Sequence, residues 1–256
     1  HDTHARRIEA GGSAETLKPV NMSMRPEQPN AGRAASSGFN LDMRHAALAW
    51  TSGLAVLALG TWLVCPRGDC GLNAFDQFGL GLAHDLRGET LDRVMRGVTW
   101  LGSLALLLPL AVLTTWFLVR RGLRKEAGFV LLALLGSSGL SHLTKLWVMR
   151  PRPDLYLAGT LMPGDWSFPS AHTMQITAAT VALFLVAGRR RAVPLGILLA
   201  IAVLLVGLSR IYLQVHFPSD VLAGLLAGAF WTIGLHALLF SRPAQTGGNN
   251  VTGDTA

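Results

Sequence analysis

Three short clusters of polar residues interrupt an otherwise apolar sequence, and each stands at the end of an apolar run. They extend from Lys145 to Arg152, from Ser170 to His172 and from Arg210 to Asp220. Ionisable groups are costly inside a membrane and commonly mark a functional site there. Because the clusters combine cations, a hydroxyl and imidazoles, we interpret them as one phosphate-handling site at a membrane surface.

The cations of these clusters are suited to binding a phosphate group. Hydrolysis of a phosphate ester concentrates negative charge on the equatorial oxygens, which fixed cations and N–H donors stabilise. Lys145, Arg152 and Arg210 supply three cations, and an arginine binds phosphate with a two-pronged fork. Ser170 adds a hydroxyl. If a helix begins here, the backbone N–H groups of residues 170–172 also face the anion.

The histidines are suited to making and breaking the bond to phosphorus. His216 and Asp220 are four residues apart, and Pro218 between them is typical of the first turn of a helix. The Asp220 carboxylate then accepts a hydrogen bond from one ring nitrogen of His216 and leaves the other free to attack phosphorus. His172 is expected to protonate the leaving oxygen and later to deprotonate the water that cleaves the phosphohistidine.

A single His-x3-Asp or Ser-Arg pattern is a packing or capping feature roughly nine times in ten. Together and in this order, the clusters resemble the motifs of the type 2 phosphatidic acid phosphatase (PAP2) family, whose active-site pattern is shared with the vanadium haloperoxidases. The motifs are Lys145-x6-Arg152-Pro153, Pro169-Ser170-Ala171-His172 and Ser209-Arg210-x5-His216-x3-Asp220. The second has Ala171 where the family usually has Gly, so the N–H is kept but the freedom to adopt φ > 0 is lost.

The resemblance covers about residues 46–240 and implies a role for each matching residue. By it, His216 is the nucleophile, Asp220 its partner and His172 the acid and base. The phosphate would be held by five residues, namely Lys145, Arg152, Ser170, Ala171 and Arg210. The family works without a metal ion, and no cofactor is expected.

The composition indicates a membrane protein. Half of the 256 residues are hydrophobic and 14% are charged, whereas soluble domains carry about 25% charged residues. The net charge of +7 does not point to nucleic acid, because the basic residues stand mainly at the ends of apolar runs. The expected partners are therefore membrane lipids and a lipid phosphate substrate.

Six apolar stretches approach the about 20 residues that a helix needs to cross a bilayer. They are residues 46–64, 98–119, 127–143, 173–187, 192–208 and 221–240. The fourth and fifth reach that length only if the adjacent polar residues belong to the same helices. We therefore predict an all-α fold: a six-span transmembrane bundle over residues 45–241, built around a PAP2/haloperoxidase-like active-site core. Disordered cytoplasmic tails are expected at 1–44 and 242–256.

The basic residues also predict the orientation of the bundle. If the spans alternate, one side receives most of them: Arg44, Arg120, Arg121, Arg124, Lys125, Arg189, Arg190, Arg191 and Arg242. That side is expected to be cytoplasmic by the positive-inside rule. Both termini then lie in the cytoplasm, and the polar clusters face the periplasm or exterior, in what we expect to be a bacterial inner membrane.

The connection between the first two spans, residues 71–97, is expected to be partly helical, because aromatic and aliphatic residues recur there at helical spacing. It lies either in the membrane interface or in solvent as a plain connector. Cys65 and Cys70 bracket a tight turn before it. The sequence is compatible with a disulfide in an oxidising compartment and equally with two free thiols.

These observations predict an integral membrane phosphatase that removes the terminal phosphate of a lipid phosphate or diphosphate. The family implies phosphatidic acid, phosphatidylglycerol phosphate, polyprenyl diphosphate and lipid A phosphate as candidates. Two alternatives stay open: a lipid phosphotransferase using the same site, and a non-catalytic membrane protein that binds an anion or a lipid. The sequence leaves the substrate and the oligomeric state open.

Overall fold

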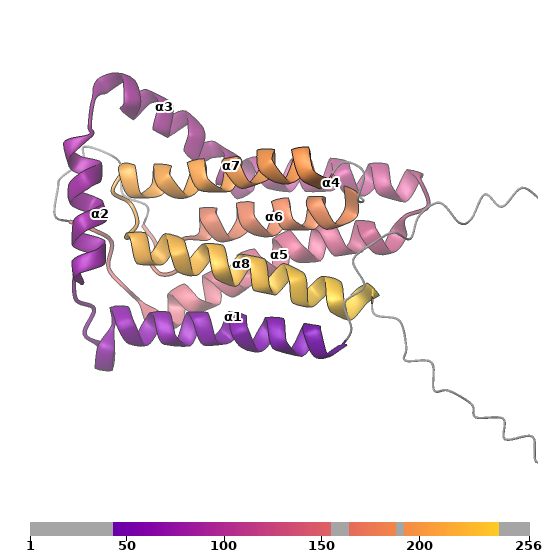
Figure 1. The fold of residues 1–256 in the computed structure, drawn as a ribbon, viewed down its shortest axis with the longest axis horizontal. Helices are drawn as coiled ribbons and strands as arrows, with labels where there is room; N and C mark the ends of the chain where they lie inside the picture. Colours follow the sequence, from indigo (N-terminus) through magenta and orange to yellow (C-terminus); the bar gives the residue numbers. More distant parts are fainter. Residues whose placement is uncertain (1–42, 155–163, 188–191, 241–256) are drawn as a thin grey trace, which may run out of the picture. The chain divides into compact units, whose positions relative to one another are not determined.

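The computed structural model describes residues 43–154, 164–187 and 192–240, whose fold is drawn in Figure 1. Within these residues the chain is all-α, as predicted. The elements are α1 (Met43–Val64), η1 (Pro66–Gly68), α2 (Ala74–Asp85), α3 (Glu89–Thr99), η2 (Trp100–Gly102), α4 (Leu104–Arg120), α5 (Arg124–Val148), α6 (Ala171–Ala187), α7 (Ala192–Tyr212) and α8 (Pro218–Phe240). The two expected tails lie outside the described residues, except that Met43 and Arg44 already belong to α1.

Several of these helices are long and apolar enough to cross a membrane. Among the described residues, α1, α5, α7 and α8 qualify, and α3 with α4 makes a fifth candidate if the bent pair counts as one span. Helix α6 is apolar but has only 17 residues, fewer than the about 20 that a bilayer core requires. The chain is therefore an integral membrane protein with four or five candidate spans, where the sequence predicted six.

The predicted span over residues 98–119 is not one continuous helix, because α3 and α4 are bent by 43° at η2. Ser103 starts α4 as its N-cap: its backbone is extended and its side chain accepts a hydrogen bond from a backbone N–H of the first turn. At Gly102, an added Cβ would lie 2.6 Å from Val206 Cγ1 and 3.0 Å from the carbonyl oxygen of His172. The chain bends here because a capping serine follows a glycine that is packed directly against α6 and α7.

The helix ends that carry the polar clusters lie together. Figure 1 shows the C-terminal ends of α5 and α7 beside the N-terminal ends of α6 and α8, with α2 lying across this end. The opposite end holds the turn between α4 and α5 and its basic residues. Helix α6 packs against α4, α5, α7 and α8, so the helix that begins with the second cluster is surrounded by the others.

Two glycines allow α8 to approach α6 closely. An added Cβ at Gly224 would lie 2.7 Å from the carbonyl oxygen of Ser170, and one at Gly228 would lie 2.6 Å from that of Met174. Both obstacles are backbone atoms, which cannot move aside as a side chain can. Small residues at this interface therefore fix the distance between the second and third polar clusters.

We expect Gly224→Ala to destabilise the protein by about 1–3 kcal/mol, the typical cost of overpacking, and to lower its activity. The added methyl would push the Ser170 carbonyl, and with it the start of α6, away from α8. The melting temperature of the detergent-solubilised protein measures the effect. Gly139→Ala is the matched control, because a Cβ at this exposed position on α5 meets nothing within 4 Å. Equal melting temperatures for the two variants would contradict the tight contact.

The connection between α1 and α4 is helical, as expected, and α2 turns an apolar side outward. Phe75 and Phe78 are 55% and 72% exposed, whereas Asp76 and Leu80 are fully buried. An outward apolar face favours a position in the membrane interface over a plain solvated connector.

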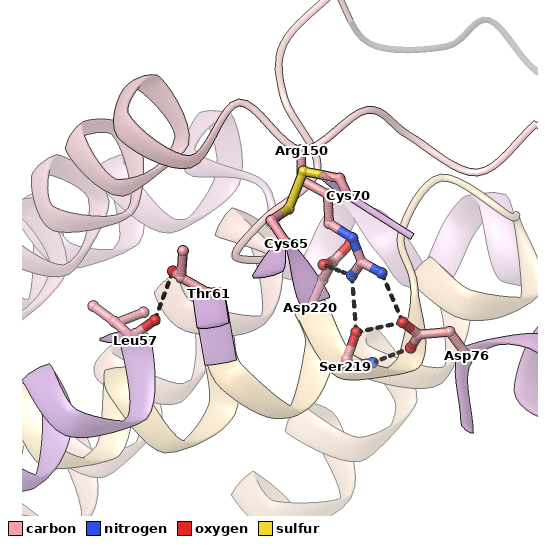
Figure 2. The surroundings of a disulfide bond; sticks show 8 residues. All are labelled: Leu57, Thr61, Cys65, Cys70, Asp76, Arg150, Ser219 and Asp220. Carbon is pink, nitrogen blue, oxygen red and sulfur yellow. Dashed lines mark hydrogen bonds and ion pairs between the residues drawn. A yellow bond between two sulfur atoms is a disulfide. The ribbon is translucent and has the colours of Figure 1, made fainter. Parts of the chain in front are cut away.

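The turn before α2 is closed by a disulfide between Cys65 and Cys70, so the first of the two open alternatives applies (Figure 2). The bridge packs with Val148 and Phe168 in an apolar cluster. The bridged turn after α1 therefore packs against residues at the end of α5 and just before α6.

Candidate active site

Helix ends position all three polar clusters. Lys145 lies in the last turn of α5, which ends because Met149 adopts a left-handed conformation with φ of 50°. Arg210 lies in the last turn of α7, and His216 lies in the short connection that follows. Helices α6 and α8 begin within the second and third clusters, as the spacing predicted, so the remaining predicted catalytic residues stand in their first turns.

The first cluster provides two cations that contact the same carboxylate. Lys145 Nζ lies 3.1 Å from Asp165 Oδ2 and also donates to the backbone oxygen of Trp166. Arg152 Nη2 donates to Asp165 Oδ1, and its Nε donates to the Asp165 backbone oxygen at 2.9 Å. Arg152 Nη1 donates to the backbone oxygen of Val215, which connects the first cluster to the third.

The same Arg152 nitrogen fixes the tautomer of His216. Nη1 of Arg152 lies 3.2 Å from His216 Nε2, and because a guanidinium only donates, Nε2 must be the acceptor. The ring proton is then on Nδ1, which lies 3.5 Å from Asp220 Oδ2 and 3.4 Å from Ser167 Oγ. The buried imidazole therefore keeps an unprotonated nitrogen directed at a cation.

The surroundings of His216 disfavour its protonation. Burial, followed by the charges of Arg210, Arg152 and Lys145, holds the pKa of His216 well below its ordinary value of 6.5. The ring is therefore neutral at neutral pH, which is the form that can act as a nucleophile.

We predict that activity falls on the acid side only below pH 6.5, because His216 becomes protonated, and loses its nucleophilic form, only near its lowered pKa. The measurement is kcat/KM against pH, corrected for the titration of the substrate phosphate itself. A His216 limb above pH 7 would contradict this assignment.

Asp220 is held by groups on both of its oxygens. Oδ2 accepts hydrogen bonds from the Phe217 N–H at 3.0 Å and from the Ser167 hydroxyl. Oδ1 accepts from Arg150 Nη1 at 2.7 Å. The carboxylate is fully buried, so its orientation toward His216 is set by these donors.

Arg150 joins Asp220 to a second buried carboxylate, Asp76 on α2 (Figure 2). Its Nη2 lies 2.7 Å from Asp76 Oδ2, and its guanidinium carbon lies 3.8 Å from the centre of the Phe217 ring. Asp76 also accepts from the backbone N–H and the hydroxyl of Ser219, each at 2.8 Å. Arg150, Asp76 and Asp220 are each at most 1% exposed, so α2 is tied to the first turn of α8 through buried charges.

Four of these residues were not found from the sequence: Asp76, Arg150, Asp165 and Ser167. Arg150 stands at one of the unspecified positions of the Lys-x6-Arg motif, so the motif assigned a role to Arg152 and none to Arg150. A signal did exist for Asp76, since it shares a helix face with Leu80 and Ala83 at i+4 and i+7. An acidic residue in an apolar stripe predicts a buried, paired carboxylate.

Arg210 and His172 complete the cation-lined side of the site. Arg210 Nη1 donates to Thr99 Oγ1 at 2.7 Å, while its Nε is buried without a hydrogen-bond partner among the described residues. His172 is partly buried at the start of α6, where the charges of Arg210 and Arg152 act on it. A buried guanidinium N–H without a partner is a donor available to an anion.

The second cluster differs from expectation at one group. The Ser170 N–H donates to the Asp220 carbonyl oxygen at 3.0 Å, so it is not directed at an anion, and its hydroxyl accepts from Thr173 Oγ1 at 3.0 Å. The N–H groups of Ala171 and His172 belong to the first turn of α6, which lacks intrahelical acceptors. Ala171 is helical and is not among the described residues with positive φ, so alanine is compatible with this backbone.

An imidazole with an unprotonated nitrogen beside one arginine and within the field of two further cations, at one end of a membrane-embedded helix bundle, has the composition of a phosphate-transfer site. The class that this fold and site define is that of the membrane phosphatases.

Comparison with known proteins agrees. The PAP2 superfamily pattern matches residues 126–243. Phosphatidylglycerophosphatase B of Bacillus subtilis is 34% identical over 152 residues, which are 56% of this chain and 72% of the relative. Undecaprenyl-diphosphatase of the same organism is 32% identical over 149 residues, covering 57% of this chain and 72% of the relative. The chain belongs to the PAP2 superfamily of membrane lipid phosphatases.

A solved structure is similar over most of its length. The crystal structure of a transmembrane PAP2 type phosphatidylglycerolphosphate phosphatase from Bacillus subtilis matches with a TM-score of 0.63 at 27% sequence identity. The match covers 76% of this chain and 95% of that chain, so the helical fold is shared over nearly the whole of that protein.

Proposed function

We propose that the protein hydrolyses the terminal phosphate of a lipid phosphate or diphosphate at the outer membrane face, through a phosphohistidine intermediate. The observation that carries the proposal is the position of His216 Nε2, an unprotonated nitrogen 3.2 Å from Arg152 Nη1. A phosphate bound by Arg152 would have its phosphorus next to this lone pair.

In the first step, the Nε2 lone pair of His216 forms a bond to phosphorus while the bond from phosphorus to the leaving oxygen breaks. His172 gives its proton to that oxygen. Asp220, whose Oδ2 lies 3.5 Å from Nδ1, stabilises the positive charge on the ring, and Ser167 Oγ lies between the two groups as a hydrogen-bond partner of both. In the second step, a water oxygen attacks phosphorus and His172 takes the water proton. The N–P bond breaks, its electron pair returns to Nε2, and inorganic phosphate is released.

The cations stabilise the charge that develops on the transferred group. Arg152 lies beside His216 Nε2, the charges of Lys145 and Arg210 also act on the ring, and the Nε of Arg210 is a buried donor without a hydrogen-bond partner among the described residues. The Ser170 hydroxyl and the Ala171 N–H are the remaining donors that we assign to the phosphate oxygens.

We place the site outside and both termini inside, in a bundle of six spans. In this arrangement α3, η2 and α4 form one bent span. Helix α6 is a short sixth span that packs against α4, α5, α7 and α8. The basic turn between α4 and α5 then faces the cytoplasm. The exposed Phe75 and Phe78 of α2 would lie in the outer interface, next to the mouth of the site.

The names of the relatives support the substrate class. One is a phosphatidylglycerophosphatase and another an undecaprenyl-diphosphatase, so lipids with a terminal phosphate are common to both. The candidates for this chain are phosphatidylglycerol phosphate, phosphatidic acid, polyprenyl diphosphate and lipid A phosphate.

The test is phosphate release by the detergent-purified protein from a panel of these lipids, with EDTA present. We expect release from at least one lipid, and the ranking identifies the substrate. Phosphatidylglycerol, a phosphodiester without a terminal phosphate, is the control and should release none. A folded protein that releases phosphate from no lipid would refute the proposal, and transfer to an added alcohol in place of water would indicate a phosphotransferase.

A further inference from the structure

The carboxylate of Asp165 lies on the two cations that we assign to the substrate phosphate. Its Oδ2 is 3.1 Å from Lys145 Nζ, and its Oδ1 accepts from Arg152 Nη2. The side chains of Lys145 and Arg152 are 3% and 9% exposed, whereas that of Asp165 is 47% exposed. A half-exposed carboxylate therefore covers two buried cations from the open side of the site.

This contact has the chemistry of phosphate recognition. A guanidinium fork and an ammonium group bind carboxylate and phosphate oxygens in the same way. Arg152 holds Asp165 with Nε and Nη2, while its Nη1 lies 3.2 Å from His216 Nε2. A phosphate placed for attack by His216 must therefore take donors that Asp165 now occupies.

Asp165 is ionised over the whole working range. Partial burial raises the pKa of its carboxyl, but the charge of Lys145 and the hydrogen bond from Arg152 outweigh this and lower the pKa from 3.8 to about 2. The carboxylate is therefore a permanent negative charge at any pH at which the enzyme is assayed.

We propose that Asp165 sets the affinity of the phosphate site as an internal competing anion, which occupies Lys145 and Arg152 in the free enzyme and leaves when a phosphate group binds. The inference rests on the proposed function, because that function makes the two cations phosphate ligands. If Asp165 has left the two cations in only a fraction of the free molecules, the apparent Kd of every anion equals its intrinsic Kd divided by that fraction. Asp165 thus weakens the binding of substrate and of inorganic phosphate by the same factor.

An internal carboxylate is useful in a site whose cations must stay charged between turnovers. Buried cations without partners are costly, and Asp165 compensates both while no phosphate is bound. When product phosphate is present, the same carboxylate competes for its cations and favours its release. Tight ground-state binding of the phosphate group would not speed the chemical step, so lowering it has little cost for kcat.

The test is anion binding by Asp165→Asn, which keeps the shape of the side chain and removes its charge. Detergent-solubilised protein is titrated by calorimetry with inorganic phosphate, sulfate and dimethyl phosphate at a pH where the first two are dianions. We expect the Kd of each anion to fall by one common factor of roughly five to ten. Asp165→Ala should tighten binding at least as much, and the melting temperatures report whether each variant is folded.

The matched control is Asp154→Asn, which removes an equal charge from an exposed side chain two residues after Arg152. Its Kd values should equal those of the wild type. Weaker or unchanged binding in the Asp165 variants would overturn the inference, because it would mean that the carboxylate preorganises the cations. A much larger gain for the dianions than for dimethyl phosphate would also overturn it, since it would mean that Asp165 stays beside the bound anion. Both readouts are independent of lipid hydrolysis, whose absence would refute the proposed function alone.

Discussion

Replacement of His216 by alanine is expected to reduce phosphate release about ten-thousand-fold or more, the scale of loss when an enzyme is deprived of its nucleophile. In the proposed mechanism the imidazole supplies the electron pair that forms the bond to phosphorus, and the cations whose charges act on the ring cannot replace it. KM should change much less than kcat, because Lys145 and Arg152 still bind the phosphate.

The decisive measurement is labelling of the enzyme from a lipid carrying a radioactive terminal phosphate, with a quench in alkali, where phosphohistidine survives. Wild type should show a labelled intermediate that His216→Ala lacks. His216→Asn, which keeps a donor for Asp220, should be equally inactive while retaining the melting temperature. His142→Ala is the matched control, since His142 is exposed on α5 one turn before Lys145. Labelling of the His216 variants would assign the nucleophile to another residue.

The parts of this site that follow from local sequence were predictable. Pro218 fixes the first turn of α8, and the four-residue spacing then puts Asp220 next to His216. The start of α6 at Ala171 lies two residues before the apolar run that begins at Thr173, and it meets the condition under which the N–H groups of the second cluster belong to a helix start. In each case the residues involved are close in the chain: His216 stands two residues before α8, and Asp220 lies in the first turn of that helix.

The parts that depend on long-range packing were not predictable. Asp76 and Arg150 are 74 residues apart, and no helical or strand period relates them. The bend between α3 and α4 likewise depends on Gly102 meeting α6 and α7, which lie far along the chain. Hydropathy alone therefore gave one continuous span there, and the spacing of apolar residues in the connection 71–97 predicted a helix without the buried partner of Asp76.

Replacement of Arg150 by methionine is expected to destabilise the protein by about 3–5 kcal/mol, the usual cost of removing one partner from a buried ion pair. Arg150 is 1% exposed between Asp76 and Asp220, each 0% exposed, so its loss leaves two buried carboxylates without their cation. The change should also lower kcat by about a hundredfold, because Asp220 loses one of the donors that orient it toward His216.

A purely structural role for Arg150 would move the melting temperature alone, so the informative readout is the pH profile. Without the guanidinium, the Asp220 charge acts on His216 undiminished and should move the acid limb of kcat/KM to higher pH. Arg150→Lys keeps the charge but has one nitrogen for two carboxylates, so it should restore the acid limb and only part of kcat.

Asp76→Asn is a second variant that tests the same prediction if Arg150→Met does not fold. It leaves Arg150 and Asp220 in place, removes the charge that lies 2.7 Å from the Arg150 guanidinium, and weakens the two hydrogen bonds that Ser219 donates to Asp76. We expect kcat to fall about tenfold with KM unchanged, because Asp76 acts on Asp220 through Arg150 and Ser219 and contacts none of the proposed phosphate ligands. Wild-type kcat and an unmoved acid limb in both variants would mean that the buried charges tie α2 to α8 and do nothing for His216. A fall in kcat at constant KM would instead make the α2 contact part of what holds the nucleophile in place.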